Sequence, residues 1–175
     1  MKYLVLSFLF VFTPFLVKSQ GADDKQTALI YYNIALSSDK IGNYERAVEY
    51  FLKAYKLDTN YNDVYNRIGN SYCKALRYSE ALPYFEKHLK MFPDSTESYM
   101  NIGNTYYVLG EYEKAIQYYE KTVAIDPNHK TAYRNMGNSY FKINNKEKYL
   151  EFFKKAAQLG DYEIQNWLRA NDEKW

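Results

Sequence analysis

The chain has 175 residues, of which 19% are aromatic, 25% are charged and one is cysteine. This length is enough for one domain with a continuous hydrophobic core. The 23 basic residues include Lys2 and Lys18, and removing those two leaves 21 bases against 21 acids. So balanced a surface gives no electrostatic basis for binding nucleic acid or an acidic membrane surface.

Residues 1–19 have the composition of a targeting signal. Lys2 gives a positive start, residues 3–17 are almost entirely apolar, and the small Ser19 precedes the expected cleavage point before Gln20. The apolar run is short for a membrane-spanning helix, and Pro14 interrupts it. We therefore expect an exported protein, periplasmic or secreted, with no stable membrane span after cleavage. A retained N-terminal membrane anchor is the alternative.

A polar leader, residues 20–27, is expected to be loose and to precede a periodic region. From Ala28 onwards the same residue types recur at intervals of 34 residues. A strict period of this size is typical of stacked repeats, in which each unit buries its apolar face on its neighbour. The recurring positions are Gly69, Gly103 and Gly137; Ala47, Ala81 and Ala115; Tyr65, Tyr99 and Tyr133; and Phe51, Phe85, Tyr119 and Phe153.

Residues 96–129 show the local structure expected of each unit. Apolar or small residues fall at i, i+3, i+4 and i+7 from Tyr99, and a second helical stripe begins at Ala115. Gly110 separates the stripes, and Pro127, which cannot continue a helix, ends the unit. Each unit is therefore predicted to be a helix, a turn, a second helix and a second turn.

This pattern of an aromatic residue, an aliphatic–Gly pair, a tyrosine, an Ala-x3-aromatic pair and a proline resembles the tetratricopeptide repeat (TPR). The units 62–95 and 96–129 match throughout, whereas the outer units depart from the pattern at Ala35 and Tyr149, as end units should. The resemblance implies an all-α fold, a right-handed α-solenoid. Its expected parts are TPR units 28–61, 62–95, 96–129 and 130–160 and a capping helix within 161–175. The junction around Gly160 also resembles Sel1-like repeats.

Catalytic and metal-binding patterns are missing from the sequence. His88 and His129 stand alone, with no second ligand one helical turn away. Cys73 has no accompanying histidine and acid that would make it a nucleophile. We expect no enzyme, no cofactor and no metal site.

The resemblance also implies a binding surface, because in a TPR stack one side of the first helices lines a concave groove. Asparagine offers a donor and an acceptor, so a row of asparagines can pair with the backbone of an extended peptide. The alternative is that these asparagines suit only the helix itself. The candidate peptide-binding residues are Asn33, Asn66, Arg67, Asn70, Met100, Asn101, Asn104, Tyr107, Arg134, Asn135, Asn138 and Phe141.

The expected function is that of an exported protein-protein interaction scaffold or adaptor. It would bind a polypeptide segment in this groove and help to assemble a cell-envelope or secretion complex. Two alternatives stay open. One is a self-associating structural module, in which Trp167 and Trp175 would matter, and the other is a glycan-binding TPR protein that uses Tyr107 and Phe141.

Overall fold

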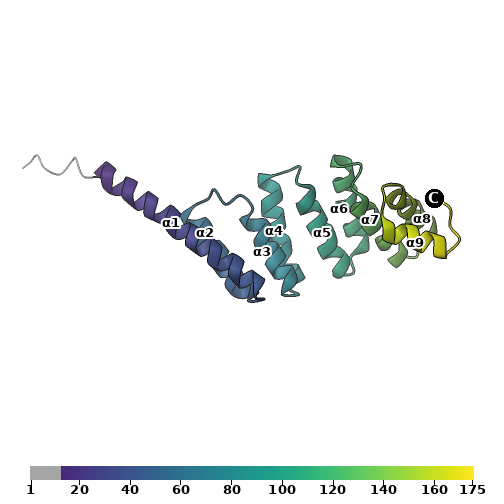
Figure 1. Ribbon diagram of the computed structural model, residues 1–175, viewed down its shortest axis with the longest axis horizontal. Helices are drawn as coiled ribbons and strands as arrows, with labels where there is room; N and C mark the ends of the chain where they lie inside the picture. The colour runs from purple at the N-terminus through teal and green to yellow at the C-terminus, as the bar shows by residue number, and fades with distance from the viewer. Residues whose placement is uncertain (1–12) are drawn as a thin grey trace, which may run out of the picture. The chain divides into compact units, whose positions relative to one another are not determined.

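The computed structural model describes residues 13–175, with side chains from Asp23 onwards. Most of the predicted signal segment lies outside the described residues. Within residues 13–175 the chain forms nine helices and no strand (Figure 1), which confirms the all-α prediction. The helices are α1 (Thr13–Lys40), α2 (Tyr44–Leu57), α3 (Val64–Lys74), α4 (Tyr78–Met91), α5 (Thr96–Val108), α6 (Tyr112–Ile125), α7 (Lys130–Lys142), α8 (Lys146–Gln158) and α9 (Tyr162–Ala170).

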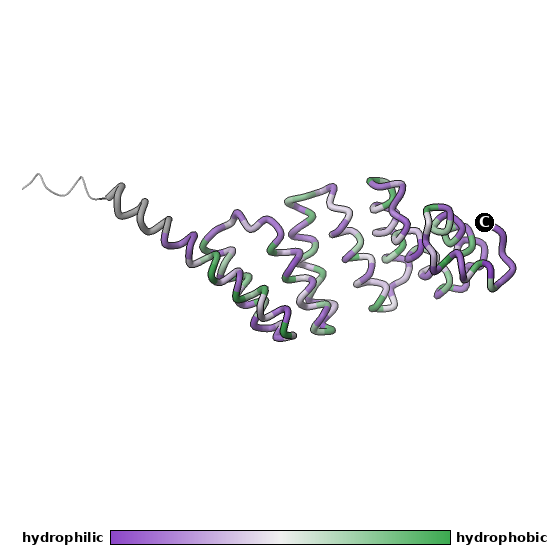
Figure 2. Tube along the Cα trace, in the orientation of Figure 1, coloured by the Kyte–Doolittle hydropathy of each residue, from purple (hydrophilic) through white to green (hydrophobic). Residues whose placement is uncertain are grey.

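The chain divides into two compact units, residues 1–64 and 65–175. In the first unit α1 packs along α2. In the second unit α4 packs on α5, α5 on α6, α6 on α7, α7 on α8 and α8 on α9, so neighbours in sequence are neighbours in space. Figure 2 shows hydrophobic and hydrophilic residues alternating along these helices, as expected for helices that bury one side. No helix within the described part of the chain is long and apolar enough to cross a membrane.

The recurring glycines and aromatic residues form the core of each helix pair. A Cβ atom at Gly69 would lie 2.5 Å from the ring of Phe85, and one at Gly103 would lie 2.6 Å from the ring of Tyr119. Such distances are too short for any side chain. Glycine is therefore required where the second helix of a pair presses its ring onto the first.

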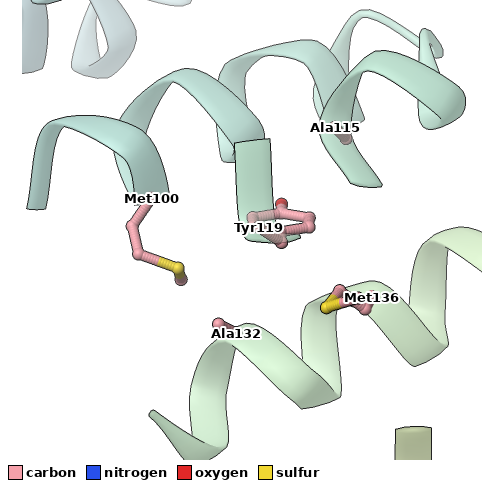
Figure 3. Close-up of a cluster of buried hydrophobic side chains, with 5 residues drawn as sticks. All are labelled: Met100, Ala115, Tyr119, Ala132 and Met136. Atoms are coloured by element: carbon pink, nitrogen blue, oxygen red, sulfur yellow. The ribbon is translucent and has the colours of Figure 1, made fainter. Parts of the chain in front are cut away.

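A cluster of buried side chains joins the third and fourth helix pairs (Figure 3). Met100 extends from α5 towards the helix that carries Ala132 and Met136. Its side chain is 7% exposed. The TPR resemblance implied a groove position for Met100, whereas the structure packs its side chain against α7. Met100 is a core residue.

The helix α9 closes the C-terminal end of the second unit. Asp161 caps it by accepting a hydrogen bond from the backbone N–H of Ile164. Ile164 and Leu168 are buried against α8, and the Trp167 ring lies edge-on to Phe153 with centroids 5.2 Å apart. This helix covers apolar surface that the last pair would otherwise expose, as predicted for a capping helix.

The helix α1 begins earlier than expected. Residues 20–27, predicted to be a loose leader, lie inside it. The physical reason is that Pro14 stands in the first helical turn, where proline is tolerated, and only Gly21 weakens the helix beyond it.

Candidate peptide-binding groove

Two of the predicted asparagines join α3 to α5. The Asn66 amide nitrogen donates to Glu97 Oε1 at 2.6 Å, and the Asn101 amide nitrogen donates to Asn66 Oδ1 at 2.9 Å. Asn66 is 5% exposed. Both sides of its amide are therefore bonded inside the protein, so Asn66 orients Asn101 rather than facing solvent.

A second pair joins α5 to α7. The Asn135 amide nitrogen donates to Asn104 Oδ1 at 2.9 Å, and the Tyr119 hydroxyl donates to the same oxygen at 2.8 Å. Burial raises the pKa of the Tyr119 phenol, which keeps it protonated as a donor. Because both bonds end on the oxygen of Asn104, the orientation of its side chain is fixed, and its amide nitrogen remains available as a donor.

Arg134 is held by the capping helix. Its guanidinium pairs with Glu163 and lies 3.4 Å from the buried carboxylate of Asp161. The same kind of bond joins the Tyr32 hydroxyl to Asp63 in the first unit, and Asn66 to Glu97 in the second. Within the second unit, these bonds tie α3 to α5 through Asn66 and α7 to α9 through Arg134. The Arg134 guanidinium is therefore engaged in ion pairs within the chain and is not a free cation for a bound peptide.

One pocket brings three predicted residues together. It lies between α3 and α5, has a volume of about 160 Å³, and is lined by Asn70, Cys73, Tyr78, Phe85, Asn101, Asn104, Thr105 and Val108. In the described part of the chain, the Asn70 side chain makes no hydrogen bond. The pocket therefore has asparagine groups with unused hydrogen-bonding capacity.

Sequence reasoning missed part of this pocket. Cys73, Tyr78 and Thr105 were not among the predicted residues. The Cys73 sulfur lies 3.5 Å from the Thr105 hydroxyl, and burial raises the pKa of the thiol. Cys73 stands three residues after Asn70 on the same helix face, and this spacing was the available signal.

The remaining predicted residues lie outside this pocket. The Tyr107 ring lies edge-on to Tyr112 at 5.4 Å, and the Phe141 ring lies edge-on to Tyr149 at 5.2 Å. Arg67 is exposed on α3 and Asn138 is half-buried on α7. Asn33 belongs to the first unit, where it lines a separate hollow of about 450 Å³.

No cluster of three or more histidine, cysteine, aspartate or glutamate side chains that could hold a metal ion occurs among the residues that the structure describes.

Two segments of this chain are tetratricopeptide repeats, because sequence profiles of that repeat match residues 28–61 and 96–129. The fold of the chain is therefore that of an all-α TPR solenoid, and this fold supports a role as a protein-interaction scaffold. The Sel1-like likeness stays a prediction.

Solved structures agree on the fold. The chain is similar to a crystal structure of MamA, with a TM-score of 0.72 and 24% identity over 85% of this chain and 86% of that one. It is also similar to residues 41 to the end of MamA from Desulfovibrio magneticus RS-1, with a TM-score of 0.70 and 26% identity over 82% and 81%. A comparison with curated protein sequences finds no match.

Proposed function

We propose that the protein is a non-enzymatic adaptor that binds a polypeptide segment along α3, α5 and α7 of its second unit. The observation that carries the proposal is the pocket between α3 and α5, where Asn70, Asn101 and Asn104 converge. Asparagine side chains can serve an extended backbone whatever its sequence, since each offers a donor and an acceptor.

The asparagines are held in place before any partner arrives. Asn101 is oriented by its bond to Asn66, and Asn104 by its bonds to Tyr119 and Asn135. Side chains that are already ordered lose less conformational entropy on binding. This arrangement favours a binding role over a purely structural one, because the bonds leave the Asn104 amide nitrogen and the Asn101 oxygen unused.

The proposed setting is outside the cytoplasm, in the assembly of a cell-envelope or secretion complex. The support comes from the sequence of residues 1–19, which has a positive start, an apolar stretch and a small residue before Gln20. A cleavage assay tests this point. Mass spectrometry of the protein from its own cells should find a mature N-terminus at Gln20, and an intact Met1 start would contradict it.

The binding proposal is tested by affinity purification after crosslinking in cells. The variant Asn70→Ala/Asn138→Ala removes two groove amides that make no internal hydrogen bond in the described structure. The matched control, Asn62→Ala/Asn128→Ala, removes two exposed loop asparagines. We expect one partner to be captured by the native protein and the control and lost from the groove variant. Equal capture by all three would refute the groove as the binding site.

Self-association is the second candidate, and an observation on α1 favours it. Ile30, Ile34 and Ser37 stand 68 residues before Ser98, Ile102 and Thr105, which are all buried in the second unit. Ile30 is nevertheless 52% exposed, and the three line the hollow of the first unit. By contrast, Trp167 is packed on Phe153 and Trp175 lies under Arg169, so the C-terminal tryptophans are engaged within the chain.

Light scattering of the full chain over a range of concentrations tests this candidate. Ile30→Glu should abolish any concentration-dependent increase in mass, because it puts a charge into the hollow. Leu29→Glu is the matched control, since Leu29 is 51% exposed and points about 100° away around the helix. A constant monomer mass at all concentrations, or equal effects of both variants, would rule out self-association through this hollow.

A further inference from the structure

We propose that the pocket between α3 and α5 is an anchor site for one uncharged side chain of the partner segment, an asparagine or glutamine that ends in a carboxamide. The inference rests on the proposed function, since it names the chemistry of the residue that the groove selects. The observation behind it is that asparagine amide groups with unused hydrogen-bonding capacity lie in a pocket that no charged side chain lines.

The size of the pocket fits a single side chain. Its volume is about 160 Å³, which is too small for a folded segment. The Phe85 ring, the Tyr78 ring and Val108 supply apolar walls on which a methylene stem can pack. A ligand side chain would therefore place its polar end among the asparagines, with its methylene stem packed on the apolar walls.

The free hydrogen-bonding groups match a carboxamide. The Asn104 oxygen already accepts two bonds, which leaves its amide nitrogen as a donor. The Asn101 amide nitrogen already donates to Asn66, which leaves its oxygen as an acceptor. Asn70 offers both. A carboxamide has one acceptor oxygen and two donor hydrogens, so it can use both kinds of group together.

Charged side chains are disfavoured at the same place. None of the eight lining residues is aspartate, glutamate, lysine or arginine. Placing a carboxylate or an ammonium group in a partly buried site without a countercharge costs free energy that neutral amides only partly return. A purely aliphatic side chain would leave the asparagine groups without partners. The pocket should therefore prefer a carboxamide over all three alternatives.

Cys73 makes the test possible, because it lines the pocket and is the single cysteine of the chain. The full chain is equilibrated at mildly alkaline pH with four symmetric disulfides whose halves are fragments of equal length, so that the Cys73 thiolate forms a mixed disulfide with one half and releases the other half as a thiol. These fragments end in a carboxamide, a carboxylate, an ammonium group or a methyl group. Intact-mass spectrometry then measures how much of each adduct forms. We expect the carboxamide adduct to exceed each of the others roughly fivefold, which corresponds to about one net hydrogen bond.

Two matched variants separate the pocket from general reactivity. Asn70→Leu should remove the preference, whereas Asn138→Leu, the same change at the equivalent position two periods of 34 residues later, should retain it. Neither asparagine makes an internal hydrogen bond in the described residues, so both variants should fold. The proposal is overturned if no fragment forms an adduct, if a charged or methyl fragment is preferred, or if Asn70→Leu keeps the preference.

The two proposals can fail separately. The fragment experiment needs no partner, so a carboxamide preference without any captured protein would contradict only the adaptor role. A captured partner that depends on Asn70 without a carboxamide preference would contradict only the anchor site.

Discussion

The hydroxyl of Tyr119 donates a hydrogen bond of 2.8 Å to the side-chain oxygen of Asn104. The ring of the same tyrosine packs on Gly103, so one side chain fills the core of the third helix pair and also orients an asparagine at the pocket. Core packing and the candidate site are therefore coupled through a single residue.

The substitution Tyr119→Phe keeps the ring and removes this bond. We expect a loss of about 1 kcal/mol in the free energy of unfolding, as is usual for one hydrogen bond. Urea denaturation measures it. We also expect the carboxamide preference at Cys73 to weaken, because Asn104 loses one of its two fixed partners. Unchanged stability together with an unchanged preference would disprove the coupling.

Stability at high pH follows from the same residue. Burial raises the pKa of the Tyr119 phenol in the folded protein, whereas in the unfolded chain the group titrates near pH ~10. Its contribution to stability is thus fully present below about pH 10 and is lost as the pH rises further. The native protein should lose more unfolding free energy than Tyr119→Phe does as the pH rises from about 8 to about 11. Equal losses would show that this phenol is not the group responsible.

The substitution Gly103→Ala should destabilise the protein although alanine favours helices over glycine by about 1 kcal/mol. The new Cβ would lie 2.6 Å from the Tyr119 ring, which is itself buried and cannot move aside freely. Overpacking of this kind costs ~1–3 kcal/mol. A rise in melting temperature would contradict the close packing of the two helices.

Leu76 adopts a positive φ of 61° in the turn between α3 and α4. The equivalent turns place Gly42, Gly110 and Asn144 in this conformation, which costs a non-glycine residue about 1–2 kcal/mol. Because Leu76 is 71% exposed, replacing it removes little buried surface. Leu76→Gly should therefore stabilise the protein by ~0.5–1 kcal/mol, as measured by thermal unfolding. The control Leu109→Gly, at a φ of −72°, should destabilise it.

Arg134 is expected to hold α9 in place. Arg134→Ala leaves the Asp161 carboxylate, which is 4% exposed, without its cation. We expect a loss of ~1–3 kcal/mol and faster hydrogen exchange in α9. Lys148→Ala breaks a more exposed pair with Glu151 and should cost less than ~0.5 kcal/mol. Equal effects of the two changes would show that Arg134 has no such role.

The sequence was sufficient to predict the fold because the residues that make the core recur with the same period of 34 residues as the helix pairs. Gly103 and Tyr119 stand at fixed positions in a period, and the structure shows why both are needed. Pairing between asparagines was not predictable. Asn66 bonds to Asn101 and Asn104 to Asn135 across neighbouring first helices, at spacings of 35 and 31 residues. Such bonds depend on how adjacent helices are offset, and helical periodicity within one helix does not contain that information.

Site-specific photo-crosslinking in cells tests the central claim most directly. A photoreactive residue replaces Tyr107, beside the candidate groove on α5, and in a second protein it replaces Gln117, exposed on α6. If a polypeptide binds along the first helices, the probe at 107 should give one dominant adduct to a partner protein, and the probe at 117 should not. Adducts to the same protein from both positions, or from 117 alone, would contradict a binding site on the first helices.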